Sequence, residues 1–112
     1  MLDALASERA FVPDLWHLEV ANTLLVGERR NRSTQVNTVT WLGFQASLPI
    51  AVDDETKAHA FGNTLSLARD HNLSAYEAAY LELGIQRGLP LATIDDKLKA
   101  AAQAVGVPLY PN

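Results

Sequence analysis

Short apolar segments alternate with longer helical segments along this chain, and this alternation constrains the fold more than any other feature. The predicted strands cover residues 11–12, 49–52, 89–94 and 107–110. Strands that alternate with helices favour an α/β fold with a parallel sheet, and strands without charge suit a sheet that is covered on both faces. We therefore predict a single α/β domain over residues 1–112.

The helical segments have recognisable starts and ends. Predicted N-caps are Asp14, Ser33, Ser74 and Asp95, because short oxygen side chains accept hydrogen bonds from the free N–H groups of a first turn. Glycine, which favours the left-handed conformation of a helix end, follows the last two helices at Gly88 and Gly106. The predicted helices cover residues 2–8, 15–30, 33–47, 55–71, 74–87 and 95–105.

Composition excludes several function classes. The 112 residues include no cysteine, which rules out a disulfide scaffold, a thiolate zinc site and a cysteine nucleophile. Thirteen acidic residues against nine Lys and Arg give a net charge of −4, so bulk charge cannot hold nucleic acid. No apolar run approaches the ~18 residues of a membrane span, and the start lacks the pattern of a signal peptide. A cytoplasmic domain away from membranes is the expectation.

Glu19 is a carboxylate in an apolar helix. It shares a helical stripe with Leu15 and Val26, and little of the surrounding surface is polar. Burying a lone carboxylate is costly, so a buried Glu19 has to be paired, protonated or bound to a metal ion. Two plain alternatives remain open: an exposed edge of the helix, or a salt bridge to an arginine.

Two further carboxylates lie where helices begin, and each has a structural alternative. Ser74 and Glu77 have the spacing of a capping box, in which the glutamate returns to the N–H of the capping residue. Asp95 follows the strand at residues 89–94 and is a natural N-cap for the last helix. A capping carboxylate still has a second oxygen, so capping and metal binding are compatible.

The three carboxylates become more informative when they are taken together. Parallel strands place functional sites beyond their carboxyl ends, so Glu19, Glu77 and Asp95 are predicted to gather at one edge of the sheet. Clustered carboxylates bind hard divalent cations such as Mg²⁺. A metal held in this way can polarise a phosphodiester and activate water.

In their order and separation, four segments resemble the PIN-domain ribonucleases of the VapC toxin type: residues 12–24, 73–81, 89–98 and 106–107. The resemblance implies a PIN-like α/β/α sandwich with a mostly parallel sheet. It implies Glu19, Glu77 and Asp95 as catalytic and metal-binding residues, with Mg²⁺ or Mn²⁺ as cofactor and metal-activated water cutting single-stranded RNA. It also implies an antitoxin protein as partner and a homodimer or other homo-oligomer.

The chain departs from that family in two ways. Glu77 stands where the family usually has Asp, which lengthens the side chain by one methylene. Family members also open with a strand that ends in a catalytic Asp and is followed by a helix. Both are expected to be missing here, and the strand would lie at the centre of the sheet. The alternative function is therefore a truncated or degenerate binding module that keeps its dimer and antitoxin surfaces without catalysis.

The remaining candidates are weaker. Arg29, Arg30 and Arg32 could contact RNA phosphates, although a solvated helix end is the favoured explanation. The histidines lack the spacing of metal ligands. An incomplete sheet is also expected to associate through apolar surface, in the region of Trp16, Val20, Trp41 or Phe44.

Overall fold

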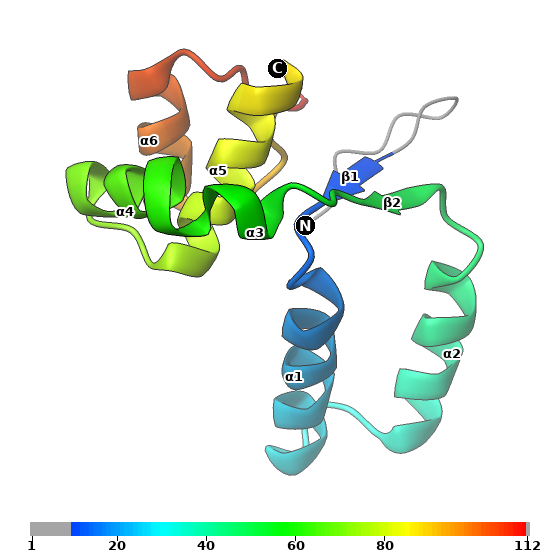
Figure 1. Ribbon diagram of the computed structural model, residues 1–112. Helices are drawn as coiled ribbons and strands as arrows, with labels where there is room; N and C mark the ends of the chain where they lie inside the picture. Colours follow the sequence, from blue (N-terminus) through cyan, green and yellow to red (C-terminus); the bar gives the residue numbers. More distant parts are fainter. Residues whose placement is uncertain (1–9, 112) are drawn as a thin grey trace.

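A computed structural model describes residues 10–111 and has a mostly helical α/β architecture (Figure 1). The predicted helical stretch over residues 2–8 lies outside this range. No helix within the described range is both long and apolar enough to cross a membrane. In chain order the elements are β1 (Ala10–Val12), α1 (Trp16–Arg29), α2 (Gln35–Gln45), β2 (Ile50–Val52), α3 (Thr56–His59), the π-helical segment η1 (Ala60–Thr64), α4 (Leu65–His71), α5 (Ala75–Arg87) and α6 (Asp96–Val105).

The sheet of the described residues consists of β1 and β2, which pair in parallel with Ala10 opposite Ile50. Helices α1 and α2 form the crossover between these strands and extend away from the helices that follow β2 (Figure 1). Both strands had been expected from the sequence. The alternation of main-chain groups along β1 leaves the N–H and C=O of Phe11 on the edge opposite β2.

The strands predicted over residues 89–94 and 107–110 are wrong as extended strands. They meet only at an isolated parallel bridge between Leu91 and Leu109. The Leu91 N–H donates to the Pro108 carbonyl at 2.8 Å, and the Tyr110 N–H donates to the Leu91 carbonyl at 2.9 Å. If the pairing continued toward the N-terminal ends of the two segments, the next hydrogen bond would be donated by the N–H of residue 108. Residue 108 is a proline, which has no N–H.

Helix α5 forms the centre of the core. Residues 78–84 are all buried, and α6 packs against them through Leu98, Ala101 and Ala102. Gly84 permits the closest approach: a Cβ there would lie 3.2 Å from the Leu89 carbonyl oxygen and 3.3 Å from Cγ1 of Val107. A side chain at this position would push the 89–91 segment away from α5.

Two of the four predicted N-caps are confirmed and two are wrong. Ser74 and Asp95 cap α5 and α6 with their side-chain oxygens. Asp14 does not cap α1, because the helix begins one residue later, after Leu15, and no side chain caps its first turn. The Asp14 N–H donates to Oγ1 of Thr56. The cap of α2 is Thr34 rather than its neighbour Ser33, with Oγ1 accepting from the Asn37 N–H at 3.1 Å.

The continuous helix predicted over residues 55–71 is wrong in its middle. It is divided into α3, η1 and α4, and Gly62 has a non-helical backbone conformation with φ −110° and ψ −107°. Glycine is the residue that tolerates such a conformation at least steric cost, and its low helix propensity makes it a frequent place for a break. Helix α4 then ends at His71, followed by Asn72 in the left-handed conformation.

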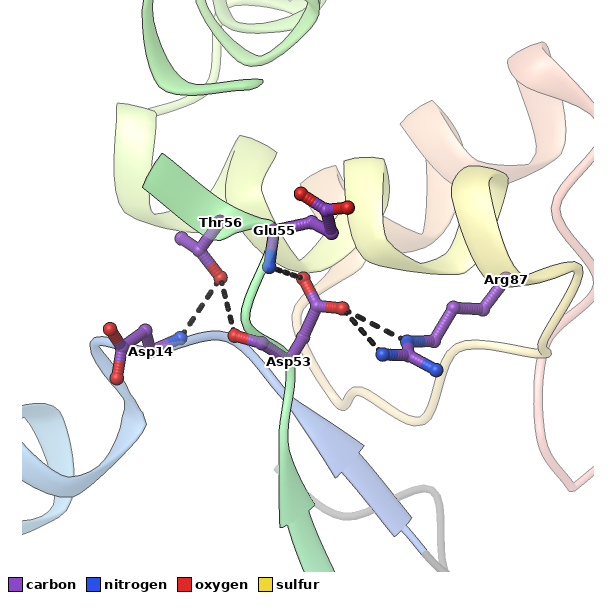
Figure 2. A network of polar contacts seen from close by, with 5 residues as sticks. All are labelled: Asp14, Asp53, Glu55, Thr56 and Arg87. Carbon is purple, nitrogen blue, oxygen red and sulfur yellow. Dashed lines mark hydrogen bonds and ion pairs between the residues drawn. The ribbon is translucent and has the colours of Figure 1, made fainter. Parts of the chain in front are cut away.

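A network of polar contacts fixes the sheet to the end of α5 (Figure 2). Asp53, which follows β2, is buried, and its Oδ1 accepts from both Nη2 and Nε of Arg87, at 2.8 and 3.0 Å. Its other carboxylate oxygen accepts from the Glu55 N–H at 3.2 Å. Arg87 also stacks over the ring of Phe11 at 4.1 Å, so both strands are linked to the core helix.

We expect Asp53→Asn to lower the free energy of unfolding by about 2 kcal/mol, because Arg87 loses its counter-charge. The loss stays below the ~3–5 kcal/mol of a fully buried pair, since the Arg87 side chain keeps 35% exposure. Urea unfolding followed by circular dichroism measures the difference. Asp54→Asn, at the exposed neighbouring position, is the control and should change stability little; equal losses in the two variants would contradict this role of Asp53.

The arm formed by α1 and α2 exposes a broad apolar surface. Helix α2 contains no charged residue and no buried residue, and it is tied to α1 by a hydrogen bond from Thr38 to Glu28. Trp16 is buried, so it belongs to the core rather than to this surface. Contiguous apolar patches on a domain of this size mark association sites. The large apolar side chains exposed on the arm are Leu18, Leu25, Val36, Val39, Trp41, Leu42 and Phe44.

We expect the chain to form a dimer or a larger assembly through the arm. Phe44→Glu should shift the assembly toward the monomer, because a charge in an apolar interface must be desolvated on association. Light scattering in the micromolar range measures the change. Phe61→Glu alters an even more exposed aromatic residue, on η1, and should leave the assembly intact, whereas a wild-type chain that stays monomeric would contradict the prediction.

Candidate functional site

A pocket of about 590 Å³ opens between α1, α5 and the start of α6. All three carboxylates singled out in the sequence, Glu19, Glu77 and Asp95, line it. They come from three separate elements that are brought together by the packing of α1 and α6 near α5. Glu19 and Glu77 are partly buried, and Asp95 is exposed.

Each of the three carboxylates belongs to the first turn of a helix or to its cap. Glu19 lies in the first turn of α1, Glu77 in that of α5, and Asp95 is the N-cap of α6. A helix N-terminus carries about half a positive charge and stabilises a nearby anion. These helix ends therefore offset part of the repulsion among three negative charges that line one pocket.

Glu19 has a partner that the sequence analysis did not anticipate. Its Oε1 accepts a hydrogen bond of 2.5 Å from the hydroxyl of Tyr80 on α5. Within residues 10–111 neither plain alternative for Glu19 holds, because the side chain is partly buried and its hydrogen-bond partner there is a phenol rather than an arginine. Burial raises the pKa of Tyr80 well above its usual range, and the hydrogen bond and the negative charge of Glu19 raise it further.

Glu77 and Asp95 perform the capping roles predicted as their structural alternatives. Oε1 of Glu77 accepts from the Ser74 N–H at 2.7 Å while the Ser74 hydroxyl accepts from the Glu77 N–H, which completes a capping box. Oδ1 of Asp95 accepts from the Leu98 N–H at 2.8 Å. These bonds fix both carboxyl groups at the pocket and engage one oxygen of each.

The donor set of the pocket suits a hard divalent cation in its chemistry, because all three groups are carboxylates. Over residues 10–111, however, no three His, Cys, Asp or Glu side chains lie close enough together to hold one ion between them. Mg²⁺ commonly binds through one or two carboxylates and keeps several water ligands. Glu19, Glu77 and Asp95 therefore form a pocket with the right ligand type rather than a closed metal cage.

Sequence reasoning did not assign the three aromatic residues of the pocket, Trp16, Trp41 and Tyr80, to it, although it named both tryptophans for another role. Tyr80 lies three residues after Glu77 on α5, a spacing that puts both on one helix face, and this was the signal that could have identified it. Trp41 reaches the pocket from α2, and no local pattern in the sequence connects that helix to the carboxylates. Arg29, Arg30 and Arg32 are exposed and do not line the pocket.

A comparison of this chain with models of known protein families finds no match, and a comparison with curated proteins finds no relative.

We expect the hydroxyl of Tyr80 to make the stability of the protein sensitive to alkaline pH. A raised pKa in the folded state stabilises the fold while the phenol is protonated, below about pH 10, the pKa of an unfolded tyrosine. Above that pH this stability is lost at up to ~1.4 kcal/mol per pH unit, because unfolding releases the proton.

Urea unfolding between neutral pH and about pH 11 measures this loss. Tyr80→Phe should be less stable at neutral pH by about 1 kcal/mol and should flatten the alkaline decline. Tyr76→Phe is the matched control, because Tyr76 is exposed on the same helix. A decline of the same steepness in the wild type and in Tyr80→Phe would rule out this role for Tyr80.

Proposed function

We propose that the protein is a metal-dependent endoribonuclease that cuts single-stranded RNA by hydrolysis, similar to the PIN-domain toxins of the VapC type. The observation that carries the proposal is the common pocket of Glu19, Glu77 and Asp95. These are the residues that the resemblance nominates, and they are far apart in the sequence. A pocket lined by them supports a shared role more strongly than any of the three positions does alone.

A PIN-like sandwich is part of this proposal. Both the β1–β2 pair and the Leu91–Leu109 bridge are parallel, as a PIN-like sheet requires. Phe11, whose main-chain groups lie on the edge of β1 opposite β2, and the segment from Leu89 to Ala92 line the same small cavity. This arrangement supports a single sheet that contains both the β1–β2 pair and the Leu91–Leu109 pair. One strand position would lie between the two pairs, and neither pair occupies it.

In the proposed site each carboxyl group has a defined task. Glu19, held by Tyr80, and Glu77 and Asp95, held by their capping bonds, would bind Mg²⁺ or Mn²⁺ through the oxygens that these bonds leave available. The cation, when bound, supplies charge neutralisation at the phosphodiester and activation of the attacking water. The hydrogen bonds keep the carboxyl groups oriented, which lowers the reorganisation needed for catalysis.

The proposed partners follow from the same resemblance. An antitoxin protein would cover the acidic pocket, and the homo-oligomer would form through the exposed apolar side chains of the arm that lie outside the pocket. The acidic balance of the chain gives no general affinity for RNA, so substrate binding would depend on the cation and on local contacts.

A second candidate function is a binding module that keeps the antitoxin and dimer surfaces but lacks catalysis. The observation in its favour is that, among the described residues, no three metal-ligating side chains converge on one point. Two of the three carboxyl groups also have a complete structural explanation as helix caps. The two candidates differ in one measurable property, which is cleavage that depends on Asp95.

We expect slow cleavage of a labelled single-stranded RNA, with Mn²⁺ supporting it better than Mg²⁺, whose octahedral geometry is more demanding. Asp95→Asn should reduce the rate by on the order of 100-fold through loss of a metal ligand. The variant keeps the cap of α6, because asparagine caps a helix as well as aspartate does. A fall in rate therefore reports on chemistry rather than on folding.

Asp96→Asn is the matched control, because Asp96 is the exposed neighbour and does not line the pocket. It should cleave at the wild-type rate. Equal rates for wild type and Asp95→Asn, or no cleavage in either metal, would reject the nuclease and favour the binding module.

A further inference from the structure

The pocket beside the carboxylates has a large apolar interior. Its walls include side chains from α1, α2 and α6, and its volume of about 590 Å³ falls within the ~300–1,000 Å³ typical of small-molecule sites. A metal ion with its water ligands makes no favourable contacts with apolar side chains, so the apolar part of the pocket requires a separate explanation. The apolar side chains that line it are Trp16, Val20, Leu24, Trp41 and Leu98.

The charge of the pocket restricts what can enter it. Three carboxylates line it, and none of its described lining residues is Lys, Arg or His. A phosphate group would be repelled there without a cation, whereas a neutral group with hydrogen-bond donors would meet acceptors on Glu19, Glu77 and Asp95. The occupant of the apolar part is therefore not an anion, and a neutral group with polar edges meets the acceptors at the rim.

A buried donor in the wall provides a second and independent observation. Trp16 is 2% exposed, and its indole Nε1 has no hydrogen-bond partner among the described residues. An unpaired buried donor costs about 1–3 kcal/mol, so most such groups have a partner in the functional state. Trp16 lines the pocket, and a bound group with an acceptor atom would relieve this cost.

Trp41 is the accessible aromatic wall. It is 38% exposed and reaches the pocket from α2, which contributes no residue to the core. Its indole can therefore receive a flat group without any rearrangement of buried side chains. Flat aromatic groups stack on tryptophan, and nucleobases do so with little dependence on their sequence.

We propose that this apolar part of the pocket is a subsite for one unstacked nucleobase of single-stranded RNA, stacked against Trp41. The proposal rests on the proposed nuclease function, because that function brings RNA to the neighbouring carboxylates. The base fits the requirements of the pocket: it is flat and uncharged, and its edge carries both donors and acceptors. The phosphodiester of the same nucleotide then lies at the carboxylate end.

Binding without cleavage tests the subsite. A fluorescently labelled single-stranded RNA is titrated with the full chain, with Ca²⁺ in place of Mg²⁺ or Mn²⁺ to suppress turnover. Trp41→Ala should raise the Kd about 10-fold or more, and Trp41→Phe should retain most of the affinity, because it keeps an aromatic face. Circular dichroism and light scattering compare the folding and assembly of the variants.

Phe61→Ala is the matched control, because Phe61 is an exposed aromatic residue outside the pocket. It should bind as the wild type does. A second experiment uses a set of RNAs that each lack one base at a different position. If the missing base is the one that occupies the subsite, the RNA should bind the wild type more weakly than the intact RNA does, and it should bind Trp41→Ala as the intact RNA does. Equal affinities for wild type and Trp41→Ala, or equal losses in Trp41→Ala and Phe61→Ala, would overturn the proposal.

The two proposals fail in different ways. RNA binding that depends on Trp41, without Asp95-dependent cleavage, supports the subsite and rejects the nuclease. Asp95-dependent cleavage with binding that ignores Trp41 supports the nuclease and rejects the subsite. A wild-type chain that binds no RNA under these conditions rejects the subsite, and the cleavage assay still decides on the nuclease.

Discussion

The buried carboxylate of Asp53 is the contact on which the arrangement of the fold depends. It follows β2 directly, receives two hydrogen bonds from Arg87 at the end of α5, and caps the turn into α3 through the Glu55 N–H. The main-chain N–H of Asp53 also donates to the Val12 carbonyl of β1. A single residue thus links the sheet to the core helix, and through β1 it sets where α1 begins.

The position of α1 matters because it carries Glu19 to the pocket. Three helices that begin around one pocket bring both negative side chains and positive helix ends to it, and the helix ends offset part of the negative charge. This partial compensation lowers the electrostatic cost of three carboxylates around one pocket in a small domain. A net negative charge remains, which favours a bound cation.

Local patterns predicted the parts of the structure that are determined locally. The capping box at Ser74 and Glu77, the cap at Asp95 and the two strands around residues 11 and 50 depend on a few neighbouring residues, and all are present. The sequence patterns also identified the three carboxylates that line one pocket.

The errors came from interactions beyond the local pattern. Asp14 is a residue type typical of N-caps, but α1 begins one residue later, after Leu15, and the Asp14 N–H makes a contact with Thr56, 42 residues away. Pro108 limits the pairing of residues 89–94 with residues 107–110, although both segments have the apolar composition of strands. Gly62 interrupts the helix predicted over residues 55–71, although its apolar stripe continues on both sides of the glycine. Tyr80 and Trp41 reach the pocket through tertiary packing, which a single sequence does not record.

Helix α2 contributes a wall to the pocket through Trp41 and contributes nothing to the hydrophobic core. Substitutions on its surface therefore carry little penalty in folding free energy, since most residues that are far from a core are close to neutral. Evolution can change the side chains that meet a ligand on this helix while α5 and α6 remain as they are. Helix α2 thus separates the evolution of ligand preference from the maintenance of the fold.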